Sequence, residues 1–219
     1  MLANPSSTAT VSGRVEFFDD DGFPLPIGIA DAGGALQADF FLAQQESGVE
    51  FSVASLDAVT ISTDGQGELA VGSAVVASDN LLGGVVRFTI PGIGIAGVGA
   101  SPPLSGFVVP VRREAGGINT GVAIQNAENQ TVTLELTLRN EQGVVVATQT
   151  IENFPATGHL ARFIGGTEDA LFPNVDTDDF QGTLVVEVAG GKVAATALEL
   201  GPLPGQFTTL PVTPLEVGL

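Results

Sequence analysis

The sequence predicts an all-β protein made of two tandem β-sandwich modules. Three observations carry this prediction: strict apolar–polar alternation in short segments, turn residues at close spacing between them, and segments that recur in the same order in both halves. The 219 residues are 44% hydrophobic, so two modules of ordinary size can each bury a core. Helix signals are almost absent, and a single helical turn accounts for TEDALFP at 167–173.

Alternation is clearest at 131–139, where polar residues separate four apolar ones and so predict a half-buried strand. The apolar residues are Val132, Leu134, Leu136 and Leu138. The segment 10–18 repeats the pattern with Val11, Val15 and Phe17 on one face. Each strand runs into a turn that ends in glycine, FFDDDG at 17–22 and LRNEQG at 138–143, where the glycine can supply a positive φ.

Further segments match between the two halves, which indicates one module that was duplicated and then diverged. The pairs are GGVVRFTIPG at 83–92 with GKVAATALELG at 191–201, GFVVPV at 106–111 with QFTTLPV at 206–212, and ADFFLA at 38–43 with HLARFIG at 159–165. Six to eight strand-like runs per module are typical of an Ig-like sandwich. We therefore expect a first module at 1–113 and a second, with a C-terminal tail, at 114–219.

The two modules differ where they begin. The second opens with an alternating strand, INTGVAIQN at 118–126, whereas the first opens only with MLAN. A shortened leading strand exposes backbone at a sheet edge, to which another strand can add. Either the sequence simply begins at that point, or a neighbouring chain or domain donates the strand; the candidate residues are Met1, Leu2, Ala3 and Asn4.

A second candidate for assembly is the glycine-rich run PGIGIAGVGASPP at 91–103. Ile93, Ile95 and Val98 lie between small residues there, so this run can form a flat strand that another chain approaches closely. The alternative is a loop folded over the core of its own module.

The order GVAIQN, HLARF, ALFP, FQGTLVVEV, KVAATALEL and FTTLPV in the second half resembles a group of modules from large secreted and cell-surface proteins of bacteria. Those modules are tandem and mostly uncharacterised β-sandwiches. The resemblance covers nearly all of 118–213 and, with more divergence, 1–111. It implies an extracellular or cell-surface setting and a non-catalytic role, and it supplies no site residue.

Composition argues against several functional classes. With 25 acidic and only 7 basic residues, the net charge of −18 disfavours nucleic acid and anionic lipid as partners. The absence of cysteine removes thiol catalysis and disulfides, and the only histidine, His159, lacks a G-x-S-x-G nucleophile elbow, so we expect no enzyme. Prolines and glycines interrupt the long uncharged stretch at 88–111, so we expect no membrane insertion.

Calcium is the one cofactor that the sequence leaves open. Asn174, Asp176 and Asp178 have the alternate spacing that lets oxygen ligands converge on one ion, although Val185 stands where a closing bidentate Glu would be needed. Solvated turn residues are the favoured interpretation of this cluster and of the acidic run at 19–21. The chain has no Trp or Tyr platform for a sugar face.

These observations predict a non-catalytic structural or adhesive module pair that acts through β-strand addition and self-association, such as a filament or surface-layer subunit. Its expected partners are copies of itself or neighbouring domains of the same surface protein. Head-to-tail pairing through the tail PLEVGL at 214–219 is one version. The alternative function is a calcium-dependent or glycan-binding module of a secreted protein.

Overall fold

The computed structural model describes residues 1–31, 47–66, 68, 70–90, 94–175, 178–203 and 205–215. These residues form antiparallel β-structure and no helix, so the all-β prediction is confirmed. The strands are β1 (Leu2–Ala3), β2 (Val11–Phe18), β3 (Ile29–Asp31), β4 (Gly48–Val53), β5 (Ala58–Val59), β6 (Ser62–Thr63), β7 (Ser73–Ser78), β8 (Gly83–Ile90), β9 (Gly94–Gly99), β10 (Gly106–Glu114), β11 (Ile118–Asn126), β12 (Val132–Asn140), β13 (Val145–Phe154), β14 (His159–Phe163), β15 (Phe180–Ala189), β16 (Val193–Leu200), β17 (Phe207–Leu210) and β18 (Thr213–Pro214).

The chain forms two compact units, Met1–Arg87 and Phe88–Leu219. The sequence places the boundary between modules later, after residue 113. The predicted bounds, 1–113 and 114–219, stay a prediction. Strand β10 pairs with β15 from Gly106 to Arg113 and so belongs to the sheet of the second unit.

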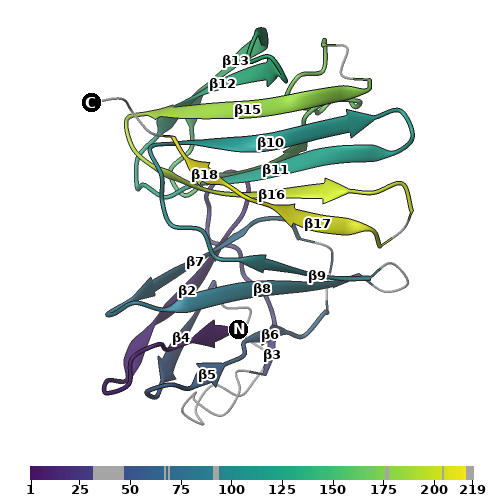
Figure 1. Ribbon diagram of the computed structural model, residues 1–219. Coiled ribbons are helices and arrows are strands. Elements are labelled where there is room, and N and C mark those ends of the chain that lie inside the picture. The colour runs from purple at the N-terminus through teal and green to yellow at the C-terminus, as the bar shows by residue number, and fades with distance from the viewer. Residues whose placement is uncertain are drawn as a thin grey trace. The chain divides into compact units, whose positions relative to one another are not determined.

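In the second unit the strand order is β13-β12-β15-β10-β11-β16-β17 (Figure 1). Strand β14 also pairs with β11, and β18 pairs with β10. A hairpin joins β10 to β11 through the pairs Arg113↔Asn119 and Glu114↔Ile118. The arrangement of the strands is β-sandwich-like.

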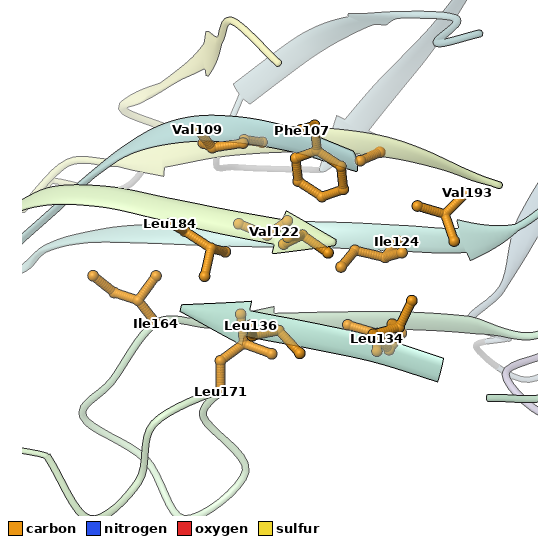
Figure 2. Close-up of a cluster of buried hydrophobic side chains, with 14 of the residues drawn as sticks. Phe107, Val109, Val122, Ile124, Leu134, Leu136, Ile164, Leu171, Leu184 and Val193 are labelled. Carbon is orange, nitrogen blue, oxygen red and sulfur yellow. The ribbon is translucent and has the colours of Figure 1, made fainter. Parts of the chain in front are cut away.

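The core of the second unit lies between these strands, where alternate residues turn inward (Figure 2). Val132, Leu134, Leu136 and Leu138 are at most 2% exposed, as the alternation at 131–139 predicts. Strand β10 adds Phe107, Val109 and Val111. Each such side chain contributes about 1.5–3 kcal/mol through its burial.

Outside the large sheet, the strands form three small groups, ordered β5-β1-β8-β9, β4-β2-β7 and β3-β6. The described core cluster of the first unit contains Leu2, Val15, Phe51, Val53 and Val59. The predicted inner face of the segment 10–18 is confirmed in its main part, because Val11 and Val15 are buried and Phe17 packs partly buried against the cluster.

The predicted glycine turns are confirmed in both units. Gly22 has φ 84° and Gly143 has φ 74°, a region that favours glycine. In TEDALFP, Ala170 N donates to Thr167 O at 3.2 Å, which is a turn without a helix.

Candidate functional site

Groups suited to metal binding do not gather in the part of the chain that the structure describes, where no three His, Cys, Asp or Glu side chains lie together. Asn174 and Asp178 lie in one open surface depression with Arg113. The Arg113 guanidinium forms an ion pair with Asp178, and its positive charge opposes cation binding there. Asp176, the middle residue of the predicted calcium set, lies outside the described residues.

His159 begins β14 and lies opposite Gln125 of β11. It is half-buried, and its backbone belongs to the sheet. The prediction of a structural or solvent-facing histidine stays a prediction.

Of the predicted assembly residues at the start of the chain, Leu2 and Ala3 form β1, which has a strand on each side, and Met1 and Asn4 flank it. Leu2 lies opposite Val59 of β5 and also opposite Gly84 of β8. The Met1 amino group donates to Val85 O at 2.9 Å, and burial, followed by the nearby Arg87 guanidinium, lowers the pKa of that amino group. Leu2 and Ala3 thus already pair within the chain; their role in assembly stays a prediction.

Asn4 ends β1 as a buried polar side chain that holds a turn. Its Nδ2 donates to Ala9 O at 2.8 Å, Val53 O at 2.9 Å and Ala54 O at 3.0 Å. Its Oδ1 accepts from Ser6 N at 2.8 Å. The Asn4 side chain therefore links the end of β1 to the end of β4 through hydrogen bonds.

Asn126 makes the corresponding contacts at the end of β11. Its Nδ2 donates to Gln130 O at 2.9 Å, Phe154 O at 3.3 Å and Pro155 O at 2.7 Å, and its Oδ1 accepts from Glu128 N at 3.0 Å. Neither buried role was predicted: Asn4 was expected only as an assembly residue and Asn126 only as the last residue of a strand, although each ends its segment, MLAN and GVAIQN.

The glycine-rich run places one of its predicted residues outward. In β9, Ile95 is 63% exposed and Val98 is buried, whereas Ile93 lies outside the described residues. An exposed isoleucine by itself identifies no partner.

The open edge of β7 is the clearest candidate for an interaction. Strand β7 pairs with β2, and no described strand pairs with its other side. Asp79 N donates to Ser12 O beside β2 at 3.0 Å. Because N–H groups alternate in direction along a strand, the N–H groups of Val75 and Ala77 also point toward β2, and that of Val76 points to the open side.

The edge of β8 is open as well, beyond the short β1. Val85 N donates to Met1 O at 3.0 Å, and the described pairing between these strands ends there. By the same alternation, Arg87 N–H points to this side. Val86, one residue before it, is 46% exposed. Among the described residues, the first unit therefore has two stretches of strand backbone with no partner strand on one side.

No protein-family model, curated protein or solved structure matches the chain. Among the described residues, no helix has the length and apolar character needed to cross a membrane.

Proposed function

We propose that the chain is a non-catalytic structural module pair of a secreted or cell-surface protein. Its two Ig-like sandwich units arose by duplication, and they associate with copies of the chain or with neighbouring repeats through β-strand addition. The observation that carries this proposal is the open edge of β7, where main-chain groups can pair with an added strand.

Equivalent strand registers support the duplication. In the first unit Leu2 lies between Val59 and Gly84, and in the second unit Ile124 lies between Leu160 and Ala195. This agreement makes β1, β5 and β8 the counterparts of β11, β14 and β16. In this proposal HLARFIG corresponds to β5 in place of ADFFLA at 38–43, which lies outside the described residues.

A second set of registers extends the correspondence. Val15 lies opposite Val76, and Leu136 lies opposite Val186, so β2 and β7 are the counterparts of β12 and β15. Neighbouring pairs keep the same spacing, since Phe17 lies opposite Ala74 as Leu138 lies opposite Leu184.

Local details that strand pairing does not require also recur. Leu56 has φ 59° and its N donates to Ser6 O at 3.0 Å; Thr157 has φ 54° and its N donates to Glu128 O at 3.1 Å. A positive φ is costly for any residue but glycine, so its repetition beside both buried asparagines favours common descent of the two turns.

Glycine positions repeat in the same way. A Cβ on Gly72 would lie 2.1 Å from Phe18 O, and one on Gly182 would lie 1.9 Å from Arg139 O. Phe18 and Arg139 occupy matching places near the ends of β2 and β12. Both units thus need glycine where the returning strand begins.

Self-association of the full chain tests the proposal. We expect the mean mass measured by light scattering after size-exclusion chromatography to rise with protein concentration. Val76→Pro removes the one N–H of that residue, which points away from β2, so the ladder between β2 and β7 keeps its hydrogen bonds. This variant is expected to stay monomeric at concentrations where the unmodified chain associates.

A matched variant controls for damage to the fold. Val75→Pro removes an N–H that points toward β2 and is expected to lower the melting temperature of the first unit, whereas Val76→Pro leaves it nearly unchanged. Val76→Lys, which keeps the backbone N–H but charges the edge, should reduce association as well. An unmodified chain that stays monomeric at every concentration would contradict self-association.

A further inference from the structure

We infer that the first unit is completed by a β-hairpin of the β10–β11 type, supplied by another repeat of the same fold. The inference deepens the proposed function, on which it rests, because it names the partner and the two edges that the partner covers. One strand of the hairpin would lie beside β7 and the other beside β8.

The first edge is identified by β10 in the second unit. Strand β10 pairs with β15, the counterpart of β7, and places Phe107 opposite Val186. Val188 N donates to Ser105 O at 3.0 Å, so the N–H groups of Val188 and Val186 point toward β10. The residue that corresponds to Val186 in the first unit is Val76, whose N–H points to the open side.

The exposed fractions of Val186 in β15 and Val76 in β7 differ as the presence or absence of a β10-like neighbour predicts. Val186 is fully buried, whereas Val76 is 38% exposed. Both residues lie opposite an apolar residue of the neighbouring strand, Leu136 in β12 and Val15 in β2. An exposed apolar residue beside unused strand backbone is the surface that strand addition recognises.

The second edge is identified by β11. Strand β11 pairs with β16 from Asn119 to Asn126, and Val122 lies opposite Ala197, which is 1% exposed. The counterpart of Ala197 is Val86, which is 46% exposed because β1 ends its pairing at Met1.

One segment covers both edges in the second unit. Residues 106–126 form a single hairpin, whose side chains Phe107 and Val109 point into the core (Figure 2). Val111 belongs to the same buried cluster. The same segment carries Arg112, Arg113 and Glu114 and so has a net charge of +1, which adds no negative charge to a chain of net charge −18. A hairpin of this kind therefore fits the geometry of the first unit.

The registers specify how to build a test. Leu2 corresponds to Ile124, so Met1 corresponds to Ala123 and the position before Met1 corresponds to Val122. A copy of residues 106–122, GFVVPVRREAGGINTGV, fused directly before Met1 of the full chain therefore puts the added hairpin in register without a linker. The control carries the same copy with its Phe107 and Val109 replaced by Asp.

Amide hydrogen exchange resolved by residue is the main measurement. In the extended chain we expect exchange at Val76 and Arg87 to slow at least tenfold relative to the unmodified chain under dilute, monomeric conditions. Exchange at Val75, whose N–H already points toward β2, should slow by a smaller factor than exchange at Val76 and Arg87, because only the added stability of the unit affects it. The melting temperature of the first unit should rise by several degrees, and the aspartate control should show neither effect.

Two results would overturn the inference. In the first, the Val76 amide of the extended chain exchanges as fast as that of the unmodified chain. In the second, Val76 is already protected in the unmodified monomer, so another part of the same chain covers the edge.

The outcome separates this inference from the proposed function. If the extended chain is protected at Val76 while the unmodified chain never associates, the hairpin inference holds and self-association fails. If the unmodified chain associates but the added hairpin gives no protection, association uses another surface and the hairpin inference fails. The free peptide 106–126, added to the unmodified chain, should slow exchange at Val76 and compete with any association.

Discussion

Replacing Asn126 with alanine is expected to destabilise the second unit by about 3 kcal/mol. The Asn126 side chain is fully buried and contacts three carbonyl oxygens through Nδ2 and one backbone N–H through Oδ1. The amide has two N–H bonds, so the contact with Phe154 O at 3.3 Å is a shared one. Three full hydrogen bonds remain, each with a net contribution of about 1 kcal/mol.

The measurement is urea unfolding of the full chain, with residue-resolved signals that report each unit separately. A loss of this size is a large fraction of the roughly 5–15 kcal/mol that stabilises a typical domain. Asn126→Asp places an oxygen where Nδ2 now lies 2.7 Å from Pro155 O, so this variant should lose at least as much stability near neutral pH.

Asn140→Ala is the matched control. Asn140 Oδ1 also accepts two backbone N–H groups, from Gln142 at 3.1 Å and Val144 at 2.9 Å, but it does so at an exposed turn. Water replaces those contacts, so the expected loss is at most about 1 kcal/mol. Equal losses of stability for Asn126→Ala and Asn140→Ala, or a loss below about 1 kcal/mol for Asn126→Ala, would refute the reasoning that burial strengthens the hydrogen bonds of Asn126.

Two further predictions concern packing and ion binding. Gly182→Ala should strongly lower the melting temperature of the second unit, because its Cβ would lie 1.9 Å from Arg139 O. The control, Gly116→Ala, has nothing within 4 Å of its Cβ and should change that temperature by only a few degrees. Equal shifts for the two variants would contradict the contact. Millimolar calcium should leave the melting temperature unchanged in calorimetry, because Arg113 pairs with Asp178. A clear rise that a chelator reverses would instead support a calcium site at these residues.

Local sequence patterns were sufficient to predict the strands. Leu134, Leu136 and Leu138 alternate with polar residues, and a period of two residues forces them onto one face whatever the partner strand is. Gly22 and Gly143 could be assigned to turns for an equally local reason, since a positive φ favours glycine.

The buried asparagines could not be predicted from residue type, because asparagine is usually exposed. Only folding brings the carbonyls of Val53 and Ala54 to Asn4, about fifty residues away along the chain. The signal that was present, an asparagine at the end of both MLAN and GVAIQN, becomes meaningful only once the contacts of both side chains are known.

What the sequence by itself determined is which segments become strands, which side of each faces inward, and where the chain turns. What the tertiary structure decided is the partner of each strand: β10 looks like the last strand of a first module, yet it pairs with β15. The physical reason is that backbone hydrogen bonds are the same for every residue, so alternation fixes a face but leaves the choice of neighbour to distant packing.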